Sequence, residues 1–233
     1  MKTIYLWVGG EGWKGFDFDA PETKEEFLKR GTTIENYATI GDSVKIGNYV
    51  KIGDFATIGD FATIGHYATI GNCATIGDSA KIGNCATIGK YVKIGYSATI
   101  DSATIGNSAT IGNYATIGYS AKIGNYATIG DYAKIGYYAT IGNYATIGNY
   151  ATIGNSATIG EKAEIKNTLH ISGSAHTLTY WGDTRIAIGC HNHSFEEWLS
   201  KFEAAGKEDG YSSEQIAEYK KYIDFIIGYH NSK

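Results

Sequence analysis

Three residues near the C-terminal end have side chains that bind metals in other proteins. Cys190, His191 and His193 lie in the segment GCHNH, where a thiol and two imidazoles offer sulfur and nitrogen ligands. An extended backbone would point the adjacent Cys190 and His191 to opposite faces, and a fourth ligand is not evident. We therefore interpret these residues as packing at a hairpin–helix junction, with a metal site as the alternative.

A second set of residues offers aromatic rings and positive charge. Its tyrosines occupy corner positions of the repeat described below, and its lysines point outward. The set consists of Tyr96, Tyr119, Tyr137, Tyr138, Lys93 and Lys122. Aromatic faces and cations suit a small anionic ligand of the nucleotide type.

The residues that must position these groups form a six-residue repeat. Isoleucine recurs at every sixth place from Ile34 to Ile100 and again from Ile105 to Ile171, which makes 24 repeats. Six is a multiple of the strand period of two but not of 3.6, so the isoleucines share one face of strands and not of a helix. Ala or Val two places earlier shares that inner face, while Thr and Gly point outward. Stacking such strands and corners buries a continuous core, which predicts a solenoid.

Two details of the repeat bear on its corners. The Asn or Asp after glycine, such as Asn143, is the residue type that tolerates a left-handed backbone, so we expect it to turn the corner. The segment IDSATI at 100–105 lacks one residue, which we interpret as a missing outward glycine in a tight corner.

Nonrepeating sequence at both ends predicts three domains. Residues 1–33 form an N-terminal strand–helix cap, with the helix over Pro21–Gly31. Residues 34–171 form the solenoid, and residues 172–233 form a hairpin followed by two helices. Ser194 with Glu197 is a capping box for the first of these helices, and Ser212 or Ser213 begins the second.

Composition limits the partners. A formal charge of −4 over 233 residues gives no bulk attraction to polyanions, so nucleic acid is not an expected partner. The opening segment MKTIYLWV is too short for a secretory core or a membrane span, so we expect no membrane association. Three cysteines do not fit a disulfide framework, which favours the cytoplasm.

The pattern I-G-N-Y-A-T resembles the hexapeptide-repeat proteins of the bacterial transferase type over residues 34–165. The resemblance implies a left-handed parallel β-helix with three repeats per triangular coil, hence about eight coils, and a homotrimer. The best-known members are acyltransferases that use an acyl-CoA or acyl carrier protein and a histidine base. On the predicted coil only His66 and His170 are histidines, and His66 stands at a corner in place of Asn or Asp.

Two features depart from the enzymes of that family. Their projecting active-site loop has no counterpart here, because no insertion interrupts the repeats. The coil also cannot supply the three histidines that bind zinc in the family's carbonic anhydrase branch. We therefore expect no cofactor in the main interpretation, and a CoA thioester with His66 as the base only in the acyltransferase alternative.

The C-terminal segment from Tyr180 to about Ile226 resembles an uncharacterised module of phage and prophage proteins, through YWG, GCHNH, EWL and GY. The resemblance implies a phage-encoded protein acting in the host cytoplasm.

These observations predict a non-enzymatic trimeric scaffold. The grooves between its subunits would bind a small anionic ligand, such as a nucleotide signal. Alternatively, its surface would bind a host protein, as in counter-defence. The alternatives are a CoA-dependent acyltransferase, a purely structural trimer and an ice-binding protein. Ice binding would use a threonine face at Thr39, Thr57, Thr75, Thr110, Thr128 and Thr146, interrupted by Lys93.

Overall fold

The computed structural model describes residues 2–165, 169–180, 182 and 184–232. The chain divides into two compact units, residues 1–164 and 165–233. Within the described ranges, no helix combines the length and the apolar composition that a membrane span requires. Predicted repeat positions 166–168 and the hairpin residues Trp181 and Asp183 lie outside the described residues.

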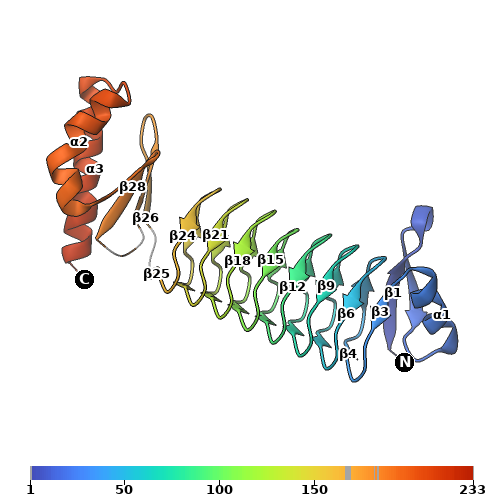
Figure 1. Cartoon of the computed structure of the whole chain (residues 1–233). Coiled ribbons are helices and arrows are strands. Elements are labelled where there is room, and N and C mark those ends of the chain that lie inside the picture. The colour runs from blue at the N-terminus through green and yellow to red at the C-terminus, as the bar shows by residue number, and fades with distance from the viewer. Residues whose placement is uncertain (1, 166–168, 181, 183, 233) are drawn as a thin grey trace. The chain divides into compact units, whose positions relative to one another are not determined.

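The first unit contains a parallel β-solenoid, which confirms the predicted fold class (Figure 1). Each interior coil strand pairs in parallel with the strands three before and three after it, so successive strands belong to three different sheets. Sheet A holds β5 (Val44–Ile46), β8 (Thr63–Ile64), β11 (Lys81–Ile82), β14 (Thr99–Ile100), β17 (Thr116–Ile117), β20 (Lys134–Ile135) and β23 (Thr152–Ile153). Sheet B holds β3 (Thr33–Ile34), β6 (Lys51–Ile52), β9 (Thr69–Ile70), β12 (Thr87–Ile88), β15 (Thr104–Ile105), β18 (Lys122–Ile123), β21 (Thr140–Ile141) and β24 (Thr158–Ile159). Sheet C holds β4 (Thr39–Ile40), β7 (Thr57–Ile58), β10 (Thr75–Ile76), β13 (Lys93–Ile94), β16 (Thr110–Ile111), β19 (Thr128–Ile129), β22 (Thr146–Ile147) and β25 (Glu164–Ile165).

The core of the coil follows from the repeat. Ile147 and Ala145 are fully buried while Thr146 between them is exposed, and the same alternation recurs along the coil. Each buried isoleucine contributes roughly 1.5–3 kcal/mol before conformational entropy is subtracted. Three strands per turn give between seven and eight turns rather than eight, because the last coil strand ends at Ile165.

The corners differ from the sequence prediction. The left-handed residue is the one after the Asn or Asp, as at Tyr144 with φ 58°, and not Asn143 itself. Asn143 instead uses its side chain, because its Oδ1 accepts the backbone N–H of Asn125 in the preceding turn at 2.8 Å. The same bond recurs at many corners and forms ladders that join successive turns. The Asn or Asp is therefore selected for its acceptor oxygen.

Glycine at the first corner position is explained by close approach between turns. A Cβ added to Gly41 would lie 2.5 Å from Asp60 Oδ1 and 2.6 Å from the Asp60 nitrogen. Its backbone N–H meanwhile bonds the carbonyl of Ile58 at 2.7 Å. Any larger residue would push the two turns apart.

The shortened turn does not lack its glycine position, as the sequence suggested. Asp101 takes that place, because its N–H donates to the carbonyl of Ile117 at 2.9 Å as the glycines do in other turns. The missing residue is the left-handed one. Its bond to the preceding turn is replaced by the hydroxyl of Ser102, which donates to the carbonyl of Asn84. The Ser102 hydroxyl can replace the one hydrogen bond that the left-handed residue makes. Loss of the glycine position would instead remove a backbone hydrogen bond between neighbouring strands of the sheet.

The N-terminal residues cover the start of the coil. Strand β1 (Thr3–Trp7) adds to sheet A beside β5, and β2 (Trp13–Asp17), which the sequence did not predict, pairs antiparallel with β1. A short 3-10 helix, η1 (Gly9–Glu11), joins them. Helix α1 (Pro21–Lys29) follows with Pro21 in its first turn, as predicted.

The second unit is an α+β module, as predicted. An antiparallel sheet of β26 (Leu169–Ser172), β27 (Thr177–Tyr180), β28 (Arg185–Ile188) and β29 (His191–Ser194) precedes α2 (Phe195–Glu208) and α3 (Ser213–Asn231). Both helices begin with a complete capping box, at Ser194 and at Ser212. Tyr219, Ile223 and Ile226 of α3 are buried in the core of this module.

Two predicted repeat residues belong to this second sheet. Ile171 pairs with Leu178 and His170 with Thr179, in an antiparallel ladder. Ile171 follows Ile165 at the six-residue spacing, but the residues between them do not include the glycine and corner residues of the repeat. The coil therefore contains 23 repeats and not 24. His66 is therefore the only histidine on the coil.

Candidate functional site

His66 is part of a corner ladder. Its Nδ1 accepts the backbone N–H of Asn48 at 2.9 Å, and its own N–H donates to Asn84 Oδ1 at 2.8 Å. An Nδ1 that accepts a hydrogen bond carries no proton, so the neutral imidazole holds its proton on Nε2. This is the opposite of what a base acting through Nε2 requires. His66 thus does the work of the Asn or Asp found at other corners.

The ladder ends one turn earlier, at Asn48. The residue 18 places before it is Arg30, which lies at the end of α1 with its N–H bonded to the carbonyls of Glu26 and Phe27. Asn48 Oδ1 is consequently buried without a hydrogen-bond partner. The cap therefore covers the coil at the cost of one unpaired acceptor.

An open groove of about 590 Å³ lies beside His66 on sheet A. The lining side chains that matter here are Trp7 and Trp13 from the N-terminal hairpin, His66 from a corner, Lys81 from β11 and Asp101 from the shortened turn. The Trp7 ring lies edge-on to His66 at 5.7 Å and to Trp13 at 5.4 Å between centroids. The groove thus combines two indoles with one cation and one carboxylate.

Three departures from the uniform repeat meet in this groove. His66 is the one imidazole at a coil corner, Asp101 belongs to the one shortened turn, and Trp7 comes from the nonrepeating cap. They are separated by up to 94 residues in the sequence. Sequence reasoning considered the first two separately and missed Trp7 and Trp13, because nothing in the sequence shows that the hairpin extends sheet A.

The backbone of Trp7 is held in place by the cap. Its carbonyl accepts the Nε–H of Arg30 at 3.0 Å, and a guanidinium nitrogen of Arg30 also donates to the carbonyl of Glu26 at 3.0 Å. Hydrogen bonds from Lys29 and Arg30 hold the pKa of the Glu26 carboxyl below its usual value. On the other side, the Lys45 ammonium lies 6.0 Å from the Trp13 ring centroid.

The tyrosines and lysines predicted as a ligand set are not brought together within one chain. Tyr96 and Lys93 lie at β13 and the corner after it, on the way from sheet C to sheet A. The other members, Tyr119, Tyr137, Tyr138 and Lys122, lie at corners between sheets A and B or on sheet B. Tyr119 and Tyr138 contact each other edge-on at 5.9 Å, whereas Tyr96 contacts Tyr114.

The threonines of the predicted ice-binding face lie in register on strands of one sheet. Thr39, Thr57, Thr75, Thr110, Thr128 and Thr146 all belong to sheet C. Lys93 pairs with Thr75 on one side and Thr110 on the other, which interrupts the row. The second outward position of each strand is glycine, so the row is one residue wide.

In the second unit, two of the predicted metal ligands converge and the third does not. Cys190, His191 and Asp209 place their ligand atoms within 4.8 Å of one another. Cys190 lies in the turn between β28 and β29, so strand alternation does not separate it from His191. His193 instead has its ring 5.0 Å from Trp198 and its Nδ1 3.8 Å from Glu197. Asp209, which the sequence did not single out, is the C-cap of α2.

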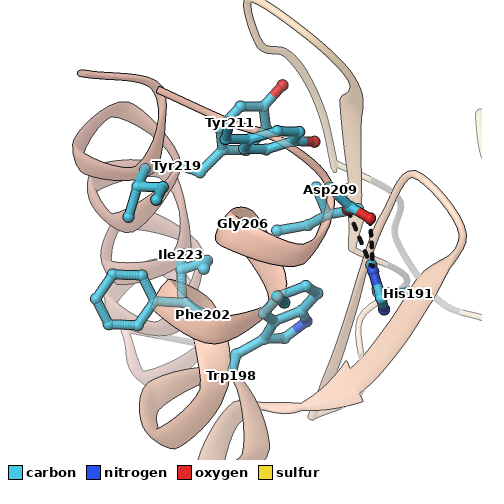
Figure 2. Close-up of a pocket in the computed structure, with 11 residues that line it drawn as sticks. His191, Trp198, Phe202, Gly206, Asp209, Tyr211, Tyr219 and Ile223 are labelled. Carbon is cyan, nitrogen blue, oxygen red and sulfur yellow. Dashed lines mark hydrogen bonds and ion pairs between the residues drawn. The ribbon is translucent and has the colours of Figure 1, made fainter. Parts of the chain in front are cut away.

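A cavity beside this cluster is too small for a ligand. It measures about 20 Å³, room for about one water molecule. Figure 2 shows it between the helices and the hairpin, with His191 and Asp209 joined at its edge and Trp198, Phe202 and Ile223 along its wall. The cluster is consequently a surface site rather than a buried pocket.

Comparison with known proteins supports the fold. The family model described as bacterial transferase hexapeptide (six repeats) matches residues 28–60, 55–90 and 102–137. A UDP-N-acetylglucosamine O-acyltransferase from Moraxella catarrhalis is similar in structure, with a TM-score of 0.57 and 24% sequence identity over 58% of this chain. The match spans 60% of the length of that acyltransferase. No curated protein sequence matches the chain.

Other solved structures align with lower scores. A hexapeptide transferase family protein from Anaplasma phagocytophilum is 14% identical over 86% of this chain and 92% of its own, with a TM-score of 0.43. A UDP-N-acetylglucosamine acyltransferase from Francisella novicida is 21% identical over 81% of this chain and 78% of its own, with a TM-score of 0.36. The family model and the Moraxella catarrhalis structure support a left-handed β-helix, in which residues 28–90 and 102–137 match the hexapeptide repeat of the model.

Proposed function

We propose that the protein binds an anionic ligand with a planar ring, of the nucleotide class, in the groove beside His66. The observation that carries this proposal is the meeting of the three departures from the repeat at one place. Neighbouring turns of the coil close with Asn at the place of His66 and with glycine at the place of Asp101.

Each lining group has a role toward such a ligand. The indoles of Trp7 and Trp13 offer faces or edges for a base. Lys81, which is exposed on β11, offers a cation to a phosphate. Asp101 lies at the same groove and would repel a phosphate, so we assign it to hydroxyl or amino donors of the ligand. His66, with its proton on Nε2, would donate a hydrogen bond.

In this proposal the protein holds its ligand without converting it, as a protein that sequesters a nucleotide signal would. A host protein as the partner would be an alternative target of the same surface. A cytoplasmic location, in the host for a phage-encoded chain, fits a nucleotide ligand.

We further propose a homotrimer, in which the predicted tyrosines Tyr96, Tyr119, Tyr137 and Tyr138 line the grooves between subunits. Exposed rings support it: Tyr114, Tyr132 and Tyr150 stack along one edge at 4.8 and 5.0 Å between centroids. Native mass spectrometry measures the subunit number directly. A monomer at micromolar concentration would contradict this assembly.

The binding test uses isothermal titration with adenine and guanine nucleotides and with CoA. Lys81→Ala is expected to weaken the binding of the best ligand at least tenfold. The matched control is Lys134→Ala, since Lys134 is also outward on sheet A but outside the groove. Equal loss in both variants, or no binding of any nucleotide by the wild type, would overturn the proposal.

Acyl transfer from a CoA thioester is the second candidate, and the comparisons favour it over binding without chemistry. The observations in its support are the transferase family model and the likeness to an acyltransferase at a TM-score of 0.57. Against it stands the hydrogen bond that Asn48 donates to His66 Nδ1. A base at Nε2 would require that bond to break and the proton to move to Nδ1.

One variant separates the two functions. His66→Asn keeps an acceptor for Asn48 and removes the imidazole. Acyl transfer from acetyl-CoA to an amine or alcohol that is abolished in this variant would establish the second candidate. Nucleotide binding by the wild type, together with no turnover of acetyl-CoA, would support the first.

A further inference from the structure

We propose that Cys190, His191 and Asp209 bind a zinc ion in the C-terminal module. Their ligand atoms, the Cys190 sulfur, a ring nitrogen of His191 and a carboxylate oxygen of Asp209, lie within 4.8 Å of one another. The Nε2 of His191 lies 3.2 Å from the Asp209 carboxylate. Neighbouring ligands of a tetrahedral zinc ion are separated by about 3.5 Å, so a small adjustment of the side chains would bring the three atoms to ligand distances.

Three separate elements fix these side chains. Cys190 occupies a two-residue turn in which Gly189 has φ 57°, and Ile188 pairs with His191 across that turn. Asp209 ends α2, where its backbone N–H donates to the carbonyl of Ala205 at 3.0 Å. Asp209 therefore meets the adjacent pair Cys190 and His191 because the hairpin turn lies beside the end of the helix.

Neighbouring rings limit the freedom of the His191 side chain. Its ring lies edge-on to Trp198 at 6.3 Å between centroids, and Trp198 is itself fixed by a bond of 2.7 Å from its Nε1–H to the carbonyl of Ile186. His191 is partly buried, whereas Cys190 and Asp209 are exposed. An ion at this point would keep access to solvent.

The electrostatics around the cluster favour a cation. Within the described part of the chain, Asp209 lies beside one basic side chain, His191. The two form an ion pair only when the imidazole is protonated. In the metal-bound state, the thiolate of Cys190 and the carboxylate of Asp209 would carry two negative charges beside a neutral imidazole, which match a divalent cation.

The ligand types select the metal. Thiolate, imidazole and carboxylate suit zinc, whereas magnesium and calcium prefer oxygen ligands throughout. Three protein ligands leave the fourth position to water. Binding releases the thiol proton of Cys190 to solvent and requires the neutral His191 to carry its proton on Nδ1. His193, whose ring packs on Trp198, stays outside the site.

The test titrates zinc into metal-free full-length protein, with a chelating dye as competitor. We expect one zinc ion per chain and at least tenfold weaker binding in both Cys190→Ser and Asp209→Asn. Matched controls are Cys85→Ser, an exposed thiol on the coil, and His193→Gln, a histidine two residues from the site. Both controls are expected to bind zinc as the wild type does.

A spectroscopic readout separates ligation from folding. Cobalt in place of zinc should give a near-ultraviolet thiolate-to-metal absorption that disappears in Cys190→Ser and persists in Cys85→Ser. Circular dichroism of the metal-free variants checks that the module is folded. Wild-type affinity equal to that of Cys190→Ser, or an equal loss in His193→Gln and Asp209→Asn, would overturn the proposal.

Discussion

The Nδ1 atom of His66 accepts a hydrogen bond of 2.9 Å from the backbone N–H of Asn48, one turn earlier in the coil. This bond makes His66 a part of the framework as well as of the groove. Replacing it by alanine leaves that N–H without its acceptor, at a cost of about 1 kcal/mol. We expect His66→Ala to lower the melting temperature of the coil by about 2–4 °C.

His66→Asn is the matched variant, because Asn occupies the equivalent corner at Asn84 and restores the acceptor. We expect it to melt like the wild type in circular dichroism. Equal destabilisation by the two substitutions would show that the ring packing with Trp7, rather than the ladder bond, is what matters at this corner.

Replacement of a coil glycine by alanine should be tolerated only where the following turn leaves room for the added Cβ. In Gly41→Ala the new Cβ would lie 2.5 Å from Asp60 Oδ1, so we expect a loss of about 1–3 kcal/mol of stability. Gly154 has the same repeat position but no atom within 4 Å of an added Cβ. Gly154→Ala is expected to be neutral or stabilising by about 0.4–1 kcal/mol, measured by urea unfolding.

The left-handed corner position should reject β-branched residues. Ser97 has φ 52°, where such a side chain is strained by about 1–3 kcal/mol. Ser97→Val is therefore expected to lower the stability of the coil, whereas Ser97→Asn should leave it nearly unchanged. Equal unfolding midpoints for the two variants would contradict the backbone assignment.

The first ladder bond gives the coil a dependence on acid. Hydrogen bonds from the Thr3 backbone and the Ser43 hydroxyl hold the pKa of Asp42 below its ordinary value. Its contribution is present above the unfolded pKa and is lost as the pH falls through the lowered folded pKa. Asp42→Asn keeps the acceptor without the charge, so its stability between pH 5 and pH 2, followed by thermal melts, should decline less steeply than that of the wild type.

The C-terminal module depends on one phenol. The Tyr219 hydroxyl donates to the carbonyl of His176 at 2.7 Å and accepts the N–H of Ala175 at 3.0 Å, and Tyr219 is buried. Tyr219→Phe removes the acceptor of the Ala175 N–H, at a cost of about 1–3 kcal/mol, while the His176 carbonyl keeps the N–H of Gly173. Hydrogen exchange should rise in α3 and β27 but not in the coil, while Tyr150→Phe, at an exposed corner, should change neither.

The repeat made the coil predictable because every strand has the same requirement. Spacing of six residues placed Ile147 inside and Thr146 outside, and the pairing of Thr75 with Thr57 and Lys93 followed from three strands per turn. The end of the coil was misplaced because Ile171 keeps the spacing while its partners change from parallel to antiparallel strands.

The site was less predictable because it depends on contacts between nonrepeating segments. His66 was noticed because it is a histidine at a coil corner. Its role in the ladder depends on which ring nitrogen faces Asn48, and the sequence does not show this. Asn143 was assigned a left-handed backbone from the general preference of asparagine. In the structure its side chain accepts a hydrogen bond in the ladder instead, and Tyr144 takes the left-handed backbone. Asp209 was missed because a helix end and a hairpin turn meet only in the folded module.

The ladders and strand pairs of the coil join residues 17 or 18 places apart in the sequence, and the shortened turn is where 17 replaces 18. Folding rates fall as contacting residues become more distant along the chain. In this coil that distance is set by the circumference of one turn, which stays the same however many turns are added. A longer version of the same protein would therefore search no further for each partner than this one does.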